Sequence, residues 1–230
     1  MPRWVLALLA VSLAAQVGWQ ASRDAGTVAA ADLPPPPGAP ALRLASFGEA
    51  EALARLTMIY LQSYDYGGAN TTPYQKLDYR RLVDWLRSIL ELDPRSQYPL
   101  FAAARVYAET PDPARMRIAL EFVHDEFLRD PNRRWPWLAH AALLAKHRLK
   151  DLPLARRYAH DLQRQTTARD VPLWAKQMEI FILEDMDELE AAKIMIAGLL
   201  ETGAVSDPAE LRFLKQRLEE LEARAAQKAR

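Results

Sequence analysis

Glutamate and histidine are the side chains of this sequence whose positions could support chemistry. Glu121 and Glu184 lie in segments with helical spacing, where one carboxyl group could serve as the general acid of a helical cell-wall glycosidase. His140 and His147 are seven residues apart and so share a helix face, but two turns separate them and no third ligand has a suitable spacing. We therefore expect no metal site, and the glycosidase ranks last among the functions considered.

The motifs of the common enzyme classes are missing from the sequence. It has no G-x-S-x-G and no H-E-x-x-H, and its eight glycines form neither a phosphate-binding loop nor a dinucleotide fingerprint. It has no cysteine, which excludes thiol catalysis, disulfides and cysteine-ligated zinc. The sequence predicts a protein that is not an enzyme and that uses no cofactor.

Aromatic side chains near arginines are the candidates for binding a partner. Tyrosines crowd around the longest internal loop, at 65–77, and an Arg-Arg-Trp-Pro-Trp cluster occupies 133–137. The alternative in both places is packing, either over the first helix pair or between one helix pair and the next. The partner-binding candidates are Tyr64, Tyr66, Tyr74, Tyr79, Arg134, Trp135 and Trp137.

Evenly spaced prolines indicate the elements that hold these side chains. Pro99, Pro136, Pro172 and Pro208 follow one another at intervals of 37, 36 and 36 residues, and each precedes an apolar helical run, which is typical of a helix start. Asp-Pro pairs at 93–94 and 130–131 indicate helix ends. Ser46 and Asp78 are expected to cap the first two helices of the folded part. The sequence predicts an all-α fold, an α-solenoid of antiparallel helix pairs.

The helix pairs resemble tetratricopeptide repeats. The run Leu-Glu-Leu-Asp-Pro before Arg95 is similar to the end of such a repeat, and small and aromatic positions of the next unit fit its pattern. These positions are Leu100, Ala104, Tyr107, Ala119, Val123 and Pro131. The resemblance covers about 77–201, with a period of 36 or 37 residues instead of 34, and it implies a concave surface for protein partners. It transfers no binding residues, because the family's clamp positions are not recognisable.

The N-terminal residues differ in composition from the rest. Residues 1–22 contain an uncharged apolar stretch after Arg3, typical of a signal anchor or, alternatively, of a cleaved signal peptide. Residues 23–43 are rich in proline and alanine and are expected to be a linker. The repeat domain is expected at 44–207. A capping helix is expected at 208–230, whose leucine stripe also allows a homodimer through a coiled coil.

The net charge and the N-terminal segment limit the kinds of partner that we expect. Thirty basic and thirty acidic residues cancel, so no overall field favours nucleic acid. An N-terminal anchor would place the folded part in the periplasm, on the inner membrane, and cleavage would release it there. We therefore expect a membrane-tethered scaffold or assembly adaptor that binds a protein partner. The alternatives are a carrier of an apolar small molecule between the inner helices, and the glycosidase.

Overall fold

The protein is helical throughout the part that the structure describes. The computed structural model describes residues 3–22, 33–64, 73–201, 203, 205 and 207–228, and all structural statements below concern these residues. They form twelve α-helices and two single-turn 3-10 helices, and no strand occurs among them. The all-α prediction is confirmed.

The helices before the centre of the chain are α1 (Arg3–Ser22), α2 (Ala39–Ala45), α3 (Ala50–Ser63), α4 (Tyr79–Leu92), α5 (Tyr98–Arg105) and α6 (Pro113–Arg129). Those after it are α7 (Pro131–His147), α8 (Leu152–Gln165), α9 (Leu173–Lys176), α10 (Met178–Asp185), α11 (Leu189–Glu201) and α12 (Pro208–Lys228). The 3-10 helices are η1 (Tyr74–Lys76) and η2 (Tyr107–Glu109).

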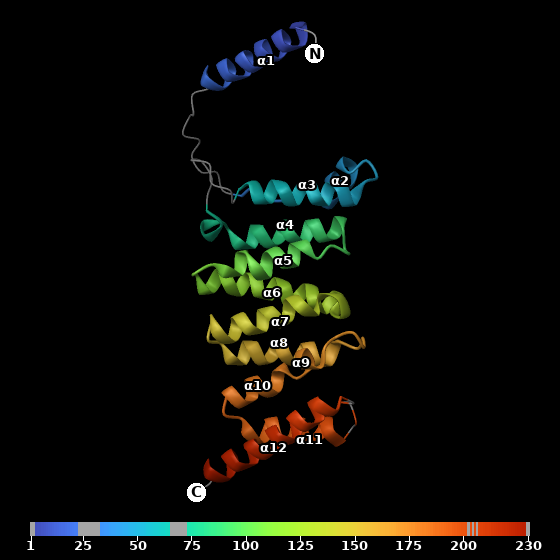
Figure 1. Cartoon of the computed structure of the whole chain (residues 1–230), viewed down its shortest axis with the longest axis vertical. Helices are drawn as coiled ribbons and strands as arrows, with labels where there is room; N and C mark the ends of the chain where they lie inside the picture. The colour runs from blue at the N-terminus through green and yellow to red at the C-terminus, as the bar shows by residue number, and fades with distance from the viewer. Residues whose placement is uncertain are drawn as a thin grey trace.

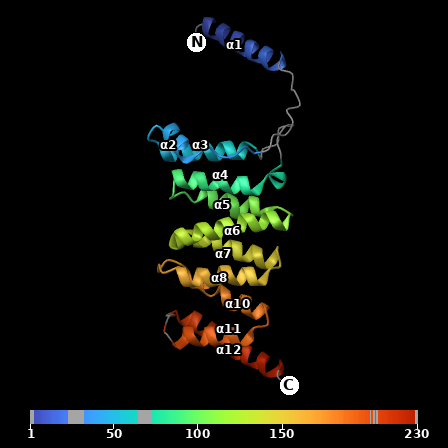
Figure 2. The same cartoon turned by 180° about the vertical axis from the view of Figure 1, so that it is seen from behind.

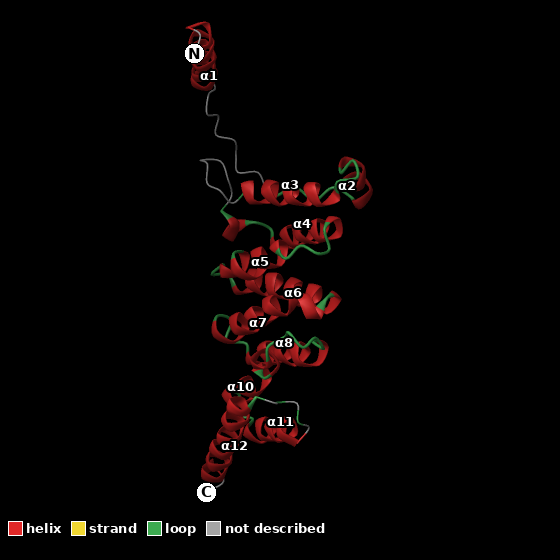
Figure 3. Ribbon diagram, turned by 45° about the vertical axis from the view of Figure 1, so that its right-hand side comes forward, coloured by secondary structure: helices red, strands yellow, loops and turns green. Residues whose placement is uncertain are grey.

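From α3 to α12 the helices lie side by side in chain order, so α3 and α12 are at opposite ends of the row (Figures 1 and 2). Helices that are neighbours in sequence pack on each other, as α6 does on α7 and α7 on α8. The view in Figure 3 shows the same succession of helices from α3 to α12. Each helix in this arrangement therefore contacts mainly the helices next to it in the row.

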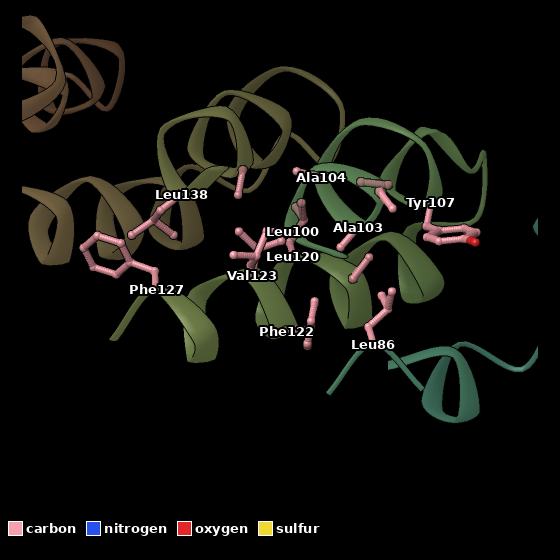
Figure 4. Close-up of a cluster of buried hydrophobic side chains, with 14 of the residues drawn as sticks. Leu86, Leu100, Ala103, Ala104, Tyr107, Leu120, Phe122, Val123, Phe127 and Leu138 are labelled. Atoms are coloured by element: carbon pink, nitrogen blue, oxygen red, sulfur yellow. The ribbon is translucent and has the colours of Figure 1, made fainter. Parts of the chain in front are cut away.

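The main core is continuous across many helices. Leu86 of α4, Leu100 of α5, Leu120 of α6 and Leu138 of α7 are fully or almost fully buried and belong to one cluster (Figure 4). A second cluster joins α10, α11 and α12. Alanines fill the α5 and α7 interfaces, which allows the helix backbones to approach closely. The buried alanines are Ala102, Ala103, Ala104, Ala139, Ala141, Ala142 and Ala145.

Acidic caps and prolines set most helix starts. The carboxylate of Asp78 accepts hydrogen bonds from the backbone N–H groups of Arg80 and Arg81, as expected, and Asp112 caps α6 in the same way. Pro99 lies in the first turn of α5 and Pro208 begins α12. These positions lack intrahelical N–H partners, so proline is tolerated there.

Two expected helix starts are wrong. Pro136 lies inside α7, because Pro131 already opens this helix directly after the Asp130 N-cap. Ser46 does not begin α3; it ends α2, and its hydroxyl donates to the carbonyl of Arg43 at 2.7 Å. Phe47 and Gly48 then turn the chain with φ values of 48° and 91°, and Glu49 precedes α3 without a side-chain cap.

Part of the expected linker packs on the fold. Leu33 is fully buried, and its carbonyl accepts a hydrogen bond of 2.9 Å from Arg81. The indole N–H of Trp85 donates to the carbonyl of Pro34 at 2.7 Å. We call residues 33–38, which have no regular secondary structure, the strap. Since α2 follows directly and buries Leu42, residues from Leu33 onward pack on the fold.

The leucine stripe of the last helix packs within the chain. Leu214 and Leu221 are buried in the second cluster, and Leu211 and Leu218 are partly buried against it. In the described residues, no helix combines the length and the apolar character needed to cross a membrane.

Candidate functional site

Five aromatic rings from α5, α7 and α9 form two contacting groups on the surface. Tyr98 stacks on Phe101 with 5.8 Å between ring centroids, and Phe101 meets the edge of Trp137 at 5.7 Å. Trp135 meets Trp174 in the same edge-on manner at 5.6 Å. Offset and edge-on contacts are the favoured geometries for aromatic pairs, so the rings support one another's positions.

Four of these rings, all except Tyr98, border a hollow of about 380 Å³, which we call the aromatic groove. Its lining is Phe101, Arg105, Trp135, Pro136, Trp137, Ala139, His140, Leu143 and Trp174. The side chain of Phe101 is 37% exposed and that of Trp174 is 53% exposed. Large apolar side chains gathered around a hollow at this level of exposure are typical of an interaction site.

The rings recur at the interval of the prolines. Phe101, Trp137 and Trp174 are 36 and 37 residues apart. They come from α5, α7 and α9, which alternate with the helices of the opposite side. Each repeat of the sequence pattern therefore contributes one ring to the same surface.

Hydrogen bonds from outside the groove fix two of the rings. The indole N–H of Trp137 donates to Oε1 of Gln97 at 2.6 Å. The amide of Gln62 on α3 donates to the hydroxyl of Tyr98 at 2.7 Å. A ring held in this way loses little conformational entropy when a ligand binds.

Arg105 and His140 are the ionisable groups of the groove. One guanidinium nitrogen of Arg105 lies 3.4 Å from Nδ1 of His140. Burial, together with the positive charge of Arg105, lowers the pKa of His140 below its ordinary value, against an opposing effect of Glu109. The groove thus contains one permanent cation beside a neutral imidazole at pH 7.

The side chains of the groove offer hydrogen-bond donors but few acceptors. None of the lining side chains carries a carboxylate or an amide carbonyl. Because a guanidinium can only donate, we assign Nδ1 of His140 as the acceptor and Nε2 as the protonated nitrogen. Nε2 is buried and has no hydrogen-bond partner among the described residues.

The structure places two predicted site residues, Trp135 and Trp137, in the groove, but it places Arg134 inside the protein. Arg134 is 4% exposed and is engaged by Glu126 and by the carbonyl of Pro94. The arginine that lines the groove is Arg105 of α5, which was not among the candidates expected from the sequence.

The predicted tyrosines lie elsewhere. Tyr79 is buried and its hydroxyl donates to the carbonyl of Tyr107 at 2.8 Å. Tyr74 is half-buried on the core, and Tyr66 lies outside the described residues. Tyr64 is also half-buried; its hydrogen bond with Tyr60, reinforced by burial, raises the pKa of Tyr60 to about 12. Tyr64, Tyr74 and Tyr79 do not line the groove.

The sequence analysis missed Phe101, Arg105 and Trp174. A signal for the two aromatic residues was present, because each lies one period from Trp137. Arg105 follows Phe101 by four residues and so shares its helix face, a relation that the α5 helix makes visible.

The glutamates considered for catalysis lie outside the aromatic groove, and each pairs with an arginine. Glu121 pairs with Arg157 and Glu184 pairs with Arg217. Glu184 is buried between α10 and α12, whereas Glu121 lies in an open hollow between α4 and α6. Within the described ranges, no cluster of three histidine, cysteine or acidic residues could hold a metal ion.

The helices facing away from the groove are joined by pairs of polar side chains. Arg87 on α4 lies 3.0 Å from Asp125 on α6, and Nε2 of His124 lies 2.7 Å from Asp161 on α8. Arg117 similarly contacts Asp151. The partners are 34 to 38 residues apart in sequence, so each pair joins segments that are about one proline interval apart.

Comparison of the chain with protein-family models, with curated protein sequences and with solved structures finds no match. The functional proposal below is therefore built on the sequence pattern and the geometry of the groove.

Proposed function

We propose that this protein is a non-enzymatic helical-repeat scaffold or assembly adaptor, a degenerate tetratricopeptide-like α-solenoid that binds a protein partner through the aromatic groove. The exposed row of rings at the repeat interval is the observation that carries this proposal. In a helical repeat, equivalent positions of successive units form one extended surface, which suits a partner protein better than a small substrate.

The pattern of contacts between units supports the solenoid. Hydrogen bonds link residues about one period apart along much of the row, as between Gln62 and Tyr98 or between Asn132 and Ala168. Stacked helix pairs produce such a spacing, because each unit contacts its neighbours and no unit buries its apolar face alone.

A membrane tether is part of the same proposal. Residues 1–22 would hold the domain on the periplasmic side of the inner membrane, or would be removed to release it into the periplasm. The uncharged run after Arg3 supports a role as anchor or signal, as do the exposed apolar side chains of α1, including Leu8 and Val11. The absence of cysteine is compatible with the periplasm, as it is with other compartments.

The C-terminal helix is proposed as an end cap. Its leucine stripe packs on α11, while its outer face carries charged residues such as Lys215 and Glu219. A homodimer through this helix would have to use another surface, because the packed leucines are not free to form a coiled coil.

One observation favours the carrier as a second candidate. A cavity of about 320 Å³ lies between α3, α4 and α5, and Ala54, Met58 and Ile89 supply apolar walls. Arg55, Gln62 and Asp93 also line it, so an apolar ligand would need a polar group to match them. Mass spectrometry of protein purified from membranes would detect such a ligand.

Crosslinking in cells tests the scaffold proposal. A photoreactive amino acid at Phe101 or Leu143 should capture a defined partner, while the same group at Arg80 or Ala114 on the opposite side should not. Arg80 and Ala114 are exposed, so they are matched controls for accessibility. Equal capture at both surfaces, or none at the groove, would contradict the proposed binding surface.

A further inference from the structure

We propose that the aromatic groove binds a proline-rich segment of the partner protein in the polyproline II conformation. This inference rests on the proposed function and names the chemistry of its partner. It is carried by the hydrogen-bonding groups of the groove and by the way the same chain holds its own proline run.

The groove needs a ligand that brings acceptors. Among the described residues, the indole N–H groups of Trp135 and Trp174 donate to no protein acceptor, and Nε2 of His140 is a buried donor without a partner. Arg105 adds further donors and forms no ion pair in this part of the chain. A ligand with many N–H groups of its own would find no matching side-chain acceptor here.

A proline-rich segment matches these requirements. Proline has no backbone N–H but keeps its carbonyl, so a run of prolines offers acceptors without donors. The polyproline II helix has no internal hydrogen bonds and presents its carbonyls outward. Its compact pyrrolidine rings also pack against aromatic side chains, which is how proline-rich segments are commonly bound in aromatic grooves.

The strap shows the same chemistry inside this protein. Its Pro34 carbonyl accepts from the indole N–H of Trp85, and its Leu33 carbonyl accepts from the guanidinium of Arg81. Tyr60 lies against Trp85, with 5.3 Å between the ring centroids. A tryptophan, itself packed against a tyrosine, and an arginine therefore hold a proline segment at α4, and the groove also combines tryptophan, a second aromatic ring and arginine.

The experiment uses the full chain in detergent with fluorescein-labelled decaproline as the probe and a (Gly-Ser)5 peptide as its control. We expect saturable binding of decaproline in fluorescence anisotropy and none of the control. Trp135→Phe and Trp174→Phe keep a ring but lose the donor, so each should raise Kd about two- to tenfold. Trp19→Phe in α1 should leave Kd unchanged.

Fluorine NMR of the chain labelled with 5-fluorotryptophan locates the bound peptide. The resonances of Trp135 and Trp174 should move on titration, while that of Trp85 stays in place. A shift confined to Trp85 would mean that decaproline exchanges with the strap, and it would overturn the assignment to the groove. Equal binding of (Gly-Ser)5, or no saturable binding, would also overturn it.

The two proposals can fail separately. Capture of a partner at Phe101 with no affinity for decaproline would leave the scaffold standing and remove the proline-rich ligand. Tighter binding of an acidic peptide than of decaproline would also leave the scaffold proposal standing and remove the proline-rich ligand. It would indicate that Arg105 pairs with a negative charge of the partner.

Discussion

The side chains of Glu126 and Arg134 form an ion pair inside the protein, with 2.8 Å between Oε2 and Nη1. They are 1% and 5% exposed. Arg134 also donates to the carbonyl of Glu126 at 2.6 Å and to that of Pro94 at 3.1 Å, so it ties α6 and α7 to the end of α4.

Removing the charge of Glu126 should destabilise the fold strongly. Glu126→Gln leaves the buried guanidinium without its counter-charge, and we expect a loss of about 3–5 kcal/mol in the free energy of unfolding. Urea unfolding followed by circular dichroism measures it. Arg129→Gln is the control, because Arg129 contacts the same carboxylate but is 62% exposed, and it should cost less than about 1 kcal/mol. Equal losses would contradict the interior role of Arg134.

Trp137 and Trp174 should differ in their effect on stability. Trp137→Phe removes the hydrogen bond to Gln97 and should lower the free energy of unfolding by about 0.5–1.5 kcal/mol. Trp174 makes no hydrogen bond among the described residues and is more exposed, so Trp174→Phe should cost less than about 0.5 kcal/mol. Thermal or urea unfolding compares the two. A larger loss for Trp174 would assign that ring to packing.

Asp151 should contribute stability that disappears in acid. A hydrogen bond from Arg117, together with the backbone N–H of Leu154, lowers the pKa of Asp151 in the folded state. A lowered carboxyl pKa means stabilisation that is present above the ordinary carboxyl pKa and is lost as pH falls through the folded value. The free energies of unfolding of wild type and Asp151→Asn should therefore differ at pH 7 and converge in acid, below the lowered pKa of Asp151. A difference independent of pH would contradict the ion pair.

Asp151→Ala also removes the α8 cap and should cost about 1 kcal/mol more.

His140 should make the fold less stable below neutral pH. Its pKa is lowered by burial and by Arg105, so below its ordinary pKa the unfolded chain takes up a proton that the folded protein resists. The free energy of unfolding should fall as pH drops through the ordinary histidine range, and it should level off below the folded pKa. His140→Gln should flatten this part of the curve, whereas the exposed His147→Gln should not. Parallel curves for His140→Gln and wild type would refute the assignment.

The strap should loosen when its tryptophan donor is removed. Trp85→Phe deletes the hydrogen bond to Pro34, so the strap should detach more often and carry α2 with it. Limited trypsin digestion should then cleave at Arg43 several times faster, as followed by mass spectrometry. Trp137→Phe, which removes an indole hydrogen bond far along the chain, should leave this rate unchanged. An unaltered rate in Trp85→Phe would mean that Leu33 and Arg81 hold the strap without it.

Sequence periodicity predicted the helical class and many helix ends, because these depend on local chemistry. Asp78 caps α4, Asp93 ends it, and Pro99 opens α5 through backbone constraints that act within a few residues. Pro136 was misassigned because Pro131, five residues earlier, satisfies the same constraint and begins the helix first. Local rules identify both prolines as suitable, but they do not say which one the fold uses.

The groove was only half predictable, since its composition depends on packing. Trp135 and Trp137 stood out as an aromatic cluster, but the burial of Arg134 next to them follows from Glu126, eight residues away and on another helix. The strap was missed for a similar reason: a proline-rich run is typical of a linker, and only the side chains of Arg81 and Trp85 on α4 make it part of the fold.

The strap also determines how the protein responds to mechanical force. Any pull that enters the described fold from the N-terminal side reaches Leu33 first and is borne by the contacts of Arg81 and Trp85 before it acts on α2 or α3. If the hydrogen bonds of Arg81 and Trp85 break before the helices unfold, the strap detaches first. The chain then lengthens by a few residues, and the force on the remaining helices is reduced.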